Sequence, residues 1–154
     1  MKFGEKIVLN SSIISVWNFL IDPIKLCKCI PGCKKIVALD ERHYEVMLDV
    51  KVGPISFSFT VATTILDMRP PVYLSFQSNG KEKAGTFTQK CILTLKAISQ
   101  QETEVCYDAD VVIMGKLSTF GERIFRAKAK QISEEFIGSL KSELLSGLNE
   151  TATS

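Results

Sequence analysis

The chain has 154 residues, of which 45% are hydrophobic, and its 19 basic residues nearly balance 17 acidic ones to give a net charge of +2. This length predicts one domain with one core, and the balanced charge excludes the strongly basic surface that nucleic-acid binding requires. No apolar run approaches the roughly 18 residues of a membrane span and no secretion signal is present, so we expect a cytoplasmic protein.

The first 32 residues predict a strand followed by two short helices. Residues 3–9 alternate as a strand does, and residues 10–12 offer capping groups before apolar residues recur at helical spacing over 13–20. A second helix is expected to begin here, because Asp22 can cap it and Pro23 suits the first helical position. Pro31 and Gly32 end this helix.

From residue 35 to 113 the apolar period changes to two, which predicts an antiparallel meander of six strands. Turn residues occur at 40–42, 53–54, 69–71, 79–80 and 99–101. Phe57, Phe59 and Val61 alternate with Ser and Thr, so one face of the sheet is expected to be apolar and the other solvated.

Residues 117–148 lack proline and carry apolar residues at four-residue steps, which predicts a helix of about 45 Å. Such a stripe winds around the helix, so a curved sheet has to wrap it diagonally. We therefore expect an α+β domain over 1–148, in which an antiparallel seven-stranded curved sheet surrounds a long C-terminal helix. Residues 149–154 are expected to form a flexible tail.

Four segments resemble a known family: Val-Trp-Asn-Phe-Leu at 16–20 before Asp22 and Pro23, Cys-Ile-Pro-Gly-Cys at 29–33, Val-Lys-Val-Gly-Pro-Ile at 50–55, and Gly-Lys-Leu at 115–117 before Phe120 and Gly121. In this order they resemble the carbon monoxide dehydrogenase G-subunit family, within the START-like (helix-grip, SRPBCC) superfamily. The resemblance covers nearly the whole chain.

The resemblance implies a helix-grip fold with a cavity for apolar ligands. It also implies a non-catalytic accessory protein of molybdenum-containing carbon monoxide dehydrogenases and related hydroxylases. Such a protein would link the enzyme to the membrane by recruitment, by binding a quinone-like lipid, or both. Longer members carry an extra C-terminal segment thought to attach them to the membrane. This chain stops after its last helix, so we expect a soluble or transiently bound form.

The expected cavity lies between the sheet and the last helix, where the small residues Ala109, Gly121, Ala127 and Ala129 leave room. A filled core is the alternative. The predicted ligand-binding residues are Phe57, Phe59, Phe76, Phe87, Gln89, Tyr107, Ile124, Phe125 and Lys128.

Three of these residues are polar, and each has two interpretations. Gln89 and Tyr107 fall on the apolar face, so the polar end of each side chain needs a hydrogen-bond partner. The partner is either a ligand carbonyl or hydroxyl, or else a backbone group or water. Lys128 either places its ammonium at the cavity mouth, near an anionic or carbonyl head group, or extends along the helix edge to solvent.

Five cysteines without a secretion signal favour reduced thiols packed in the core. Cys27, Cys29 and Cys33 lack the nearby His or fourth Cys of a structural zinc site, and a reversible Cys29–Cys33 disulfide stays open as an alternative. His43, the only histidine, lies on the solvated face with no nucleophile beside it. No dinucleotide or phosphate-binding motif occurs, so we expect no catalytic residue, metal or cofactor.

These observations leave three functional hypotheses. The first is a carrier of a quinone or lipid-like molecule that acts beside a molybdenum hydroxylase such as carbon monoxide dehydrogenase. The second is a structural adaptor with a solid core that recruits the dehydrogenase through its two short helices. The third is an enzyme such as the cyclases of the same superfamily. Basic residues cluster at 25–35 and 123–130, and these clusters would allow transient contact with the inner membrane surface.

Overall fold

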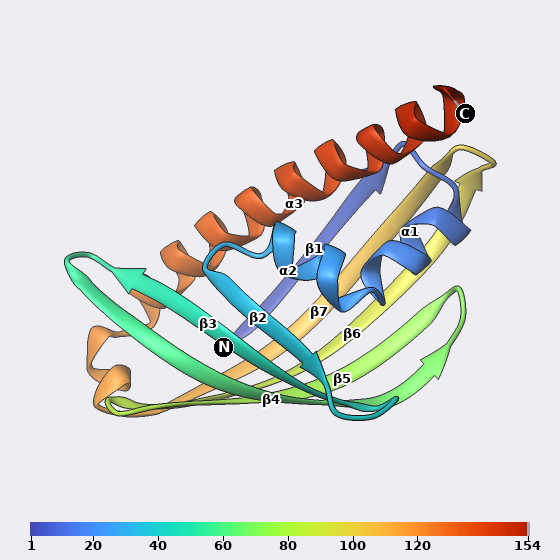
Figure 1. The fold of residues 1–154 in the computed structure, drawn as a ribbon. Coiled ribbons are helices and arrows are strands. Elements are labelled where there is room, and N and C mark those ends of the chain that lie inside the picture. Colours follow the sequence, from blue (N-terminus) through green and yellow to red (C-terminus); the bar gives the residue numbers. More distant parts are fainter. Residues whose placement is uncertain (154) are drawn as a thin grey trace.

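The computed structural model describes the backbone of residues 1–153 and the side chains of residues 1–145. Seven antiparallel strands form one sheet in the order β1-β7-β6-β5-β4-β3-β2. The sheet is strongly curved, and the helices lie on its concave side (Figure 1). This architecture confirms the predicted helix-grip fold class. The elements are β1 (Lys2–Leu9), α1 (Ile13–Leu20), α2 (Pro23–Cys29), β2 (Cys33–Ala38), β3 (His43–Val52), β4 (Ile55–Arg69), β5 (Tyr73–Glu82), β6 (Gly85–Ser99), β7 (Glu102–Gly115), the 3₁₀ helix η1 (Lys116–Phe120) and α3 (Glu122–Thr153).

Side-chain caps begin the two short helices, as the sequence predicts. The Ser12 hydroxyl accepts a hydrogen bond from the Ser15 backbone N–H at 3.2 Å. One Asp22 carboxylate oxygen accepts from the N–H groups of Ile24 and Lys25, at 3.0 and 3.2 Å. These bonds satisfy donors that have no partner inside the first helical turn.

The last helix differs from its prediction at both ends. The chain forms η1 first and breaks at Gly121, whose φ of 85° lies in the left-handed region that favours glycine. The α-helix therefore begins at Glu122 rather than at Leu117, and it continues past the predicted end at 148 to Thr153. The predicted tail, 149–154, lies outside the residues described with side chains. Within residues 1–153, no helix has both the length and the hydropathy needed to cross a bilayer.

A predicted turn at residues 79–80 is also wrong. Asn79 and Gly80 lie inside β5, where Asn79 pairs with Thr88 and Gly80 with Phe87. The glycine serves packing here: the Phe87 ring occupies the position that a β-carbon at residue 80 would take. The chain instead turns after Glu82, whose carboxylate accepts a hydrogen bond from the Ala84 backbone N–H.

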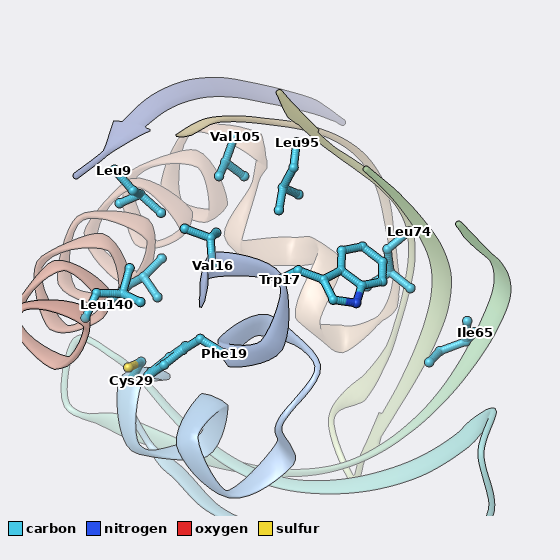
Figure 2. Packing of buried hydrophobic residues seen from close by; sticks show 11 residues of the cluster. Leu9, Val16, Trp17, Phe19, Cys29, Ile65, Leu74, Leu95, Val105 and Leu140 are labelled. Carbon is cyan, nitrogen blue, oxygen red and sulfur yellow. The ribbon is translucent and has the colours of Figure 1, made fainter. Parts of the chain in front are cut away.

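The buried apolar residues form two separate clusters. The first, which we call the α1 cluster, surrounds Val16 and Trp17 of α1 (Figure 2). Its buried members are Leu9, Val16, Trp17, Phe19, Cys29, Ile65, Leu74, Leu95, Val105, Leu140 and Leu144. The second, which we call the aromatic cluster, lies near η1, and its buried members are Phe57, Phe59, Val61 and Leu117. Burial of one such large side chain contributes about 1.5–3 kcal/mol, so each cluster stabilises one end of the domain.

Candidate ligand-binding site

Residues 126–135, in the first half of α3, belong to neither cluster. Phe125 packs against the aromatic cluster and Phe136 against the α1 cluster, while residues 126–135 contribute to neither. The two Phe positions lie about 16 Å apart along the helix axis. Within this stretch, α3 is joined to the edge strand β1: Arg126 donates to the Lys2 backbone oxygen at 3.1 Å and Ser133 donates to Glu5 at 2.7 Å. The helix crosses the concave side of the sheet (Figure 1), and residues 126–135 lie between its contacts with the two clusters.

Four of the predicted side chains on the inner face of the sheet are only half-buried, whereas Ser78 beside them is buried. Phe76, Phe87, Gln89 and Tyr107 all have inward positions by strand alternation, yet each keeps intermediate exposure. Residues at such positions in a close-packed core are normally buried. Solvent therefore reaches part of each of these four side chains.

Aromatic rings form the wall at the η1 end of the interior. Phe59 contacts Phe87 edge to face with centroids 5.2 Å apart, and Phe57 contacts Phe120 in the same way at 5.9 Å. Phe120 in turn meets Phe125 at 6.2 Å. The edge-to-face geometry is the one that ring quadrupoles favour. The structure thus brings four predicted residues, Phe57, Phe59, Phe87 and Phe125, to one apolar wall.

Phe76 is separate from this wall. It lies on β5 opposite Cys91 and packs against the α1 cluster, toward the other end of the interior. The predicted apolar lining therefore divides between two ends of the domain.

Tyr107 is bound by protein groups at the edge of the sheet. Its hydroxyl lies 3.5 Å from the Ser133 hydroxyl of α3 and 3.4 Å from a Glu5 carboxylate oxygen of β1. Ser133 donates to the same Glu5 oxygen at 2.7 Å. Burial raises the pKa of Tyr107, the Ser133 hydrogen bond opposes this shift, and the Glu5 charge adds to it. This network joins β1, β7 and α3.

A groove of about 410 Å³ opens between the β3–β4 hairpin and the start of α3. Its lining includes Lys51, Val52, Ile124, Lys128 and Gln131. Ile124 is 41% exposed and so lies on the rim, and the Lys128 ammonium donates to the Gln131 amide oxygen at 3.3 Å. Lys51 and Lys128 have no acidic partner within residues 1–145. The groove therefore combines apolar side chains with two ammonium groups.

The cysteines depart from the expectation of reduced thiols. A disulfide joins Cys27 of α2 to Cys33 of β2, with their Cα atoms 5.4 Å apart. Cys29 is not its partner, because that residue points into the α1 cluster, where burial and the Glu143 charge raise its thiol pKa. Burial, reinforced by Asp108, raises the pKa of Cys91 to about 12. Neither buried thiol ionises near neutral pH, which a nucleophile or metal ligand would have to do.

His43 lies outside the interior. Its Nδ1 lies 2.9 Å from the Asp40 carboxylate in the exposed turn before β3. Within residues 1–145, no three His, Cys, Asp or Glu side chains are placed to hold a metal ion.

Sequence reasoning missed four residues that form hydrogen bonds on the inner face or at the edge of the sheet. Thr63 and Ser78 hydrogen bond to each other at 2.8 Å. Both follow the alternation of the predicted inward residues, so the period-two pattern could have identified them. Glu5 and Ser133 gave no such signal, because their contact joins segments that are 128 residues apart.

Solved structures with the same fold are similar to this chain over nearly its whole length. A conserved protein from Geobacillus kaustophilus matches with a TM-score of 0.89 and 24% identity, over 95% of this chain and 96% of that one. A START superfamily protein from Mycobacterium smegmatis matches with a TM-score of 0.74 and 12% identity, over 94% of this chain and 97% of that one. The Zhui aromatase/cyclase from Streptomyces sp. R1128 matches with a TM-score of 0.71 and 13% identity, over 94% of this chain and 93% of that one. At these identities the likeness shows the START-like fold alone.

No curated protein matches the sequence. The family model of CoxG, the G subunit of carbon monoxide dehydrogenase, matches residues 6–145, which is most of the chain and includes every element from the middle of β1 to the described side chains of α3. The chain therefore belongs to the CoxG family, the carbon monoxide dehydrogenase G-subunit family.

Proposed function

We propose that this chain is a non-catalytic accessory protein that binds a quinone-like or lipid-like molecule between the sheet and α3. In this role it links a molybdenum hydroxylase, such as a carbon monoxide dehydrogenase, to the membrane. The observation that carries the proposal is the break in the apolar core beneath residues 126–135. A break of this kind, walled by aromatic rings and open to solvent, suits an apolar guest.

The rim groove supports an approach to the membrane. Lys51 and Lys128 present positive charge beside the exposed apolar side chain of Ile124. Basic groups near an anionic leaflet each contribute about 1 kcal/mol of attraction. A guest leaving the bilayer would enter between the β3–β4 hairpin and α3.

A test begins with the intact chain and the neutral apolar fluorophore N-phenyl-1-naphthylamine. The proposal expects saturable binding, seen as a rise in probe fluorescence. Phe59→Asp places a charge in the aromatic wall, where Phe59 is 8% exposed, and should abolish binding. Thr60→Asp is the matched control, because Thr60 is the next residue of β4 and is exposed on the opposite face.

Both variants are first checked for folding by circular dichroism. Native mass spectrometry of gently purified protein adds an independent readout, since a carrier should retain a lipophilic guest of defined mass. Binding by a folded Phe59→Asp variant that equals binding by the wild type contradicts the carrier.

A structural adaptor is the second candidate, and one observation favours it. Ile14 of α1 and Ile24 of α2 are 56% and 72% exposed, and Lys25 and Lys28 accompany them on α2. Apolar side chains rimmed by charge on two adjoining helices suit a protein partner. An adaptor carries no guest and binds no probe, so the experiments above separate the two candidates.

A further inference from the structure

Three polar side chains form one row across the concave face of the sheet. Thr63 of β4 pairs directly with Ser78 of β5, and Ser78 pairs with Gln89 of β6. The Thr63 and Ser78 hydroxyls are 2.8 Å apart and hydrogen bond. We call these three residues the polar row.

The polar row lies where the apolar core is interrupted. On β4, Thr63 stands between Val61 of the aromatic cluster and Ile65 of the α1 cluster. On β6, Gln89 stands between Phe87, which packs against the aromatic cluster, and the buried Cys91. The row therefore has an apolar region on each side along these strands.

Gln89 has hydrogen-bonding groups to spare. An amide side chain offers two N–H donors and one acceptor, and within residues 1–145 the Gln89 amide has no protein partner. Its polar atoms are also not sealed from solvent, because no buried side-chain N or O atom in that part of the chain lacks a partner. Polar groups in an apolar setting are costly unless they are bonded, so a guest that fills this space has to match them.

The charge around the row is low. Lys90 neighbours Gln89 in sequence, but it is exposed and lies on the opposite face of β6 by alternation. Lys128 donates to Gln131 at the rim groove. The N-terminal ammonium lies one strand further on, where it donates to the carbonyl of Val111, the partner of Gln89, at 2.7 Å and pairs with Asp110 at 3.7 Å. The three side chains of the row are thus uncharged.

From this arrangement we propose that the polar row selects guests with an uncharged carbonyl group flanked by apolar parts on both sides. Amide N–H and hydroxyl donors bind the carbonyl oxygen, while the two clusters contact the flanking rings or chains. Plain hydrocarbons leave the row unsatisfied, and an ionised fatty acid brings a charge that no side chain of the row balances. This inference rests on the proposed carrier function and names the chemical class of its guest.

The test uses fluorene and 9-fluorenone, two rigid tricyclic probes that differ by one central carbonyl. Each is titrated against the wild-type chain loaded with N-phenyl-1-naphthylamine, and its dissociation constant follows from displacement. Gln89→Met keeps the length of the side chain and removes its donors. It should weaken 9-fluorenone about three- to tenfold, the effect of one lost hydrogen bond, and leave fluorene unchanged or tighter.

Gln77→Met is the matched control, because Gln77 lies on β5 at an outward position next to Ser78. It should change neither constant. Thr63→Val, which removes the hydroxyl with little change of shape, is the second test of the row and should also weaken 9-fluorenone alone.

The infrared carbonyl stretch of 9-fluorenone bound to the wild type needs no variant. A hydrogen-bonded carbonyl absorbs at lower frequency than the same compound in alkane, and this shift should shrink in Gln89→Met. An alkane-like frequency, or variants that weaken both probes equally or neither, overturns the polar row and leaves the carrier standing. Failure of both probes and of the fluorophore to bind the wild type removes the carrier itself, and the row with it.

Discussion

Phe87 lies over Gly80, its direct partner across β5 and β6, and its ring fills the position that a β-carbon at residue 80 would occupy. The ring is thereby held against Phe59 in an edge-to-face contact. This one glycine fixes the position of the aromatic wall relative to the polar row, because Ser78 and Gln89 are the next inward residues along the same two strands.

Gly80→Ala should therefore push the Phe87 ring away from β5 and into the interior. We expect the free energy of unfolding to fall by about 1–3 kcal/mol, the usual cost of overpacking, and affinity for N-phenyl-1-naphthylamine to fall with it. Urea unfolding and probe titration measure the two effects. Gly138→Ala is the control, since a β-carbon there meets nothing within 4 Å. It should stabilise the helix by about 0.5–1 kcal/mol. An unchanged Gly80→Ala variant contradicts the packing.

Ser133→Ala should loosen α3 from the edge of the sheet. The substitution removes the hydroxyl that donates to Glu5 at 2.7 Å and lies beside Tyr107. A hydrogen bond of this kind contributes about 1 kcal/mol, so chemical denaturation should show a loss of that order. In a Glu5→Gln background the same substitution should cost less, because the charged acceptor is already absent. Equal costs in both backgrounds would show that Ser133 and Glu5 are not coupled.

Reduction of the Cys27–Cys33 disulfide should lower the free energy of unfolding by about 2 kcal/mol, since the link closes a short loop between α2 and β2. Unfolding curves with and without a phosphine reductant measure the change. Thiol titration of the unreduced, denatured chain should find the three free cysteines, Cys29, Cys91 and Cys106. In the Cys27→Ser variant, reductant should change the free energy of unfolding by no more than the experimental error. Five reactive thiols in the unreduced wild type would refute the disulfide.

Asp49 should make the stability of the β2–β3 region depend on acid pH. Hydrogen bonds from the Lys34 ammonium and the Ser58 hydroxyl, at 2.9 Å each, lower the pKa of this carboxyl. The ionised form is thus favoured in the native state, so the stabilisation is complete above the unfolded pKa of about 3.9. It is lost as the pH falls through the lower native pKa.

The corresponding measurement is the melting temperature of the wild type and of Asp49→Asn from neutral pH to about pH 2, the range over which an Asp of lowered pKa titrates. The difference between the two proteins should be constant near neutrality and vanish at the acid end. Lys34→Ala should reduce it, because it removes the first of the two donors. A difference that does not change with pH would exclude Asp49 as its source.

The sequence alone determined the order of the main elements and the inward face of the sheet, because both follow from local periodicity. It did not determine the limits of β5 and α3. Alternation in β4 and β6 was enough to place Phe57, Phe59 and Phe87 on one face, and Asp22 followed by Pro23 was enough to begin α2. The CoxG motifs, which the family match over residues 6–145 supports, then indicated the fold.

Only the tertiary structure decided how distant segments meet. The Cys27–Cys33 pair, the Phe87 ring over Gly80 and the Glu5–Ser133 bond each depend on strand register or on where a helix crosses the sheet. A period of two or of 3.6 residues fixes which face a side chain occupies, but carries no information about which partner faces it. The absence of residues 126–135 from both clusters is of this second kind, because it depends on where the helix crosses the sheet.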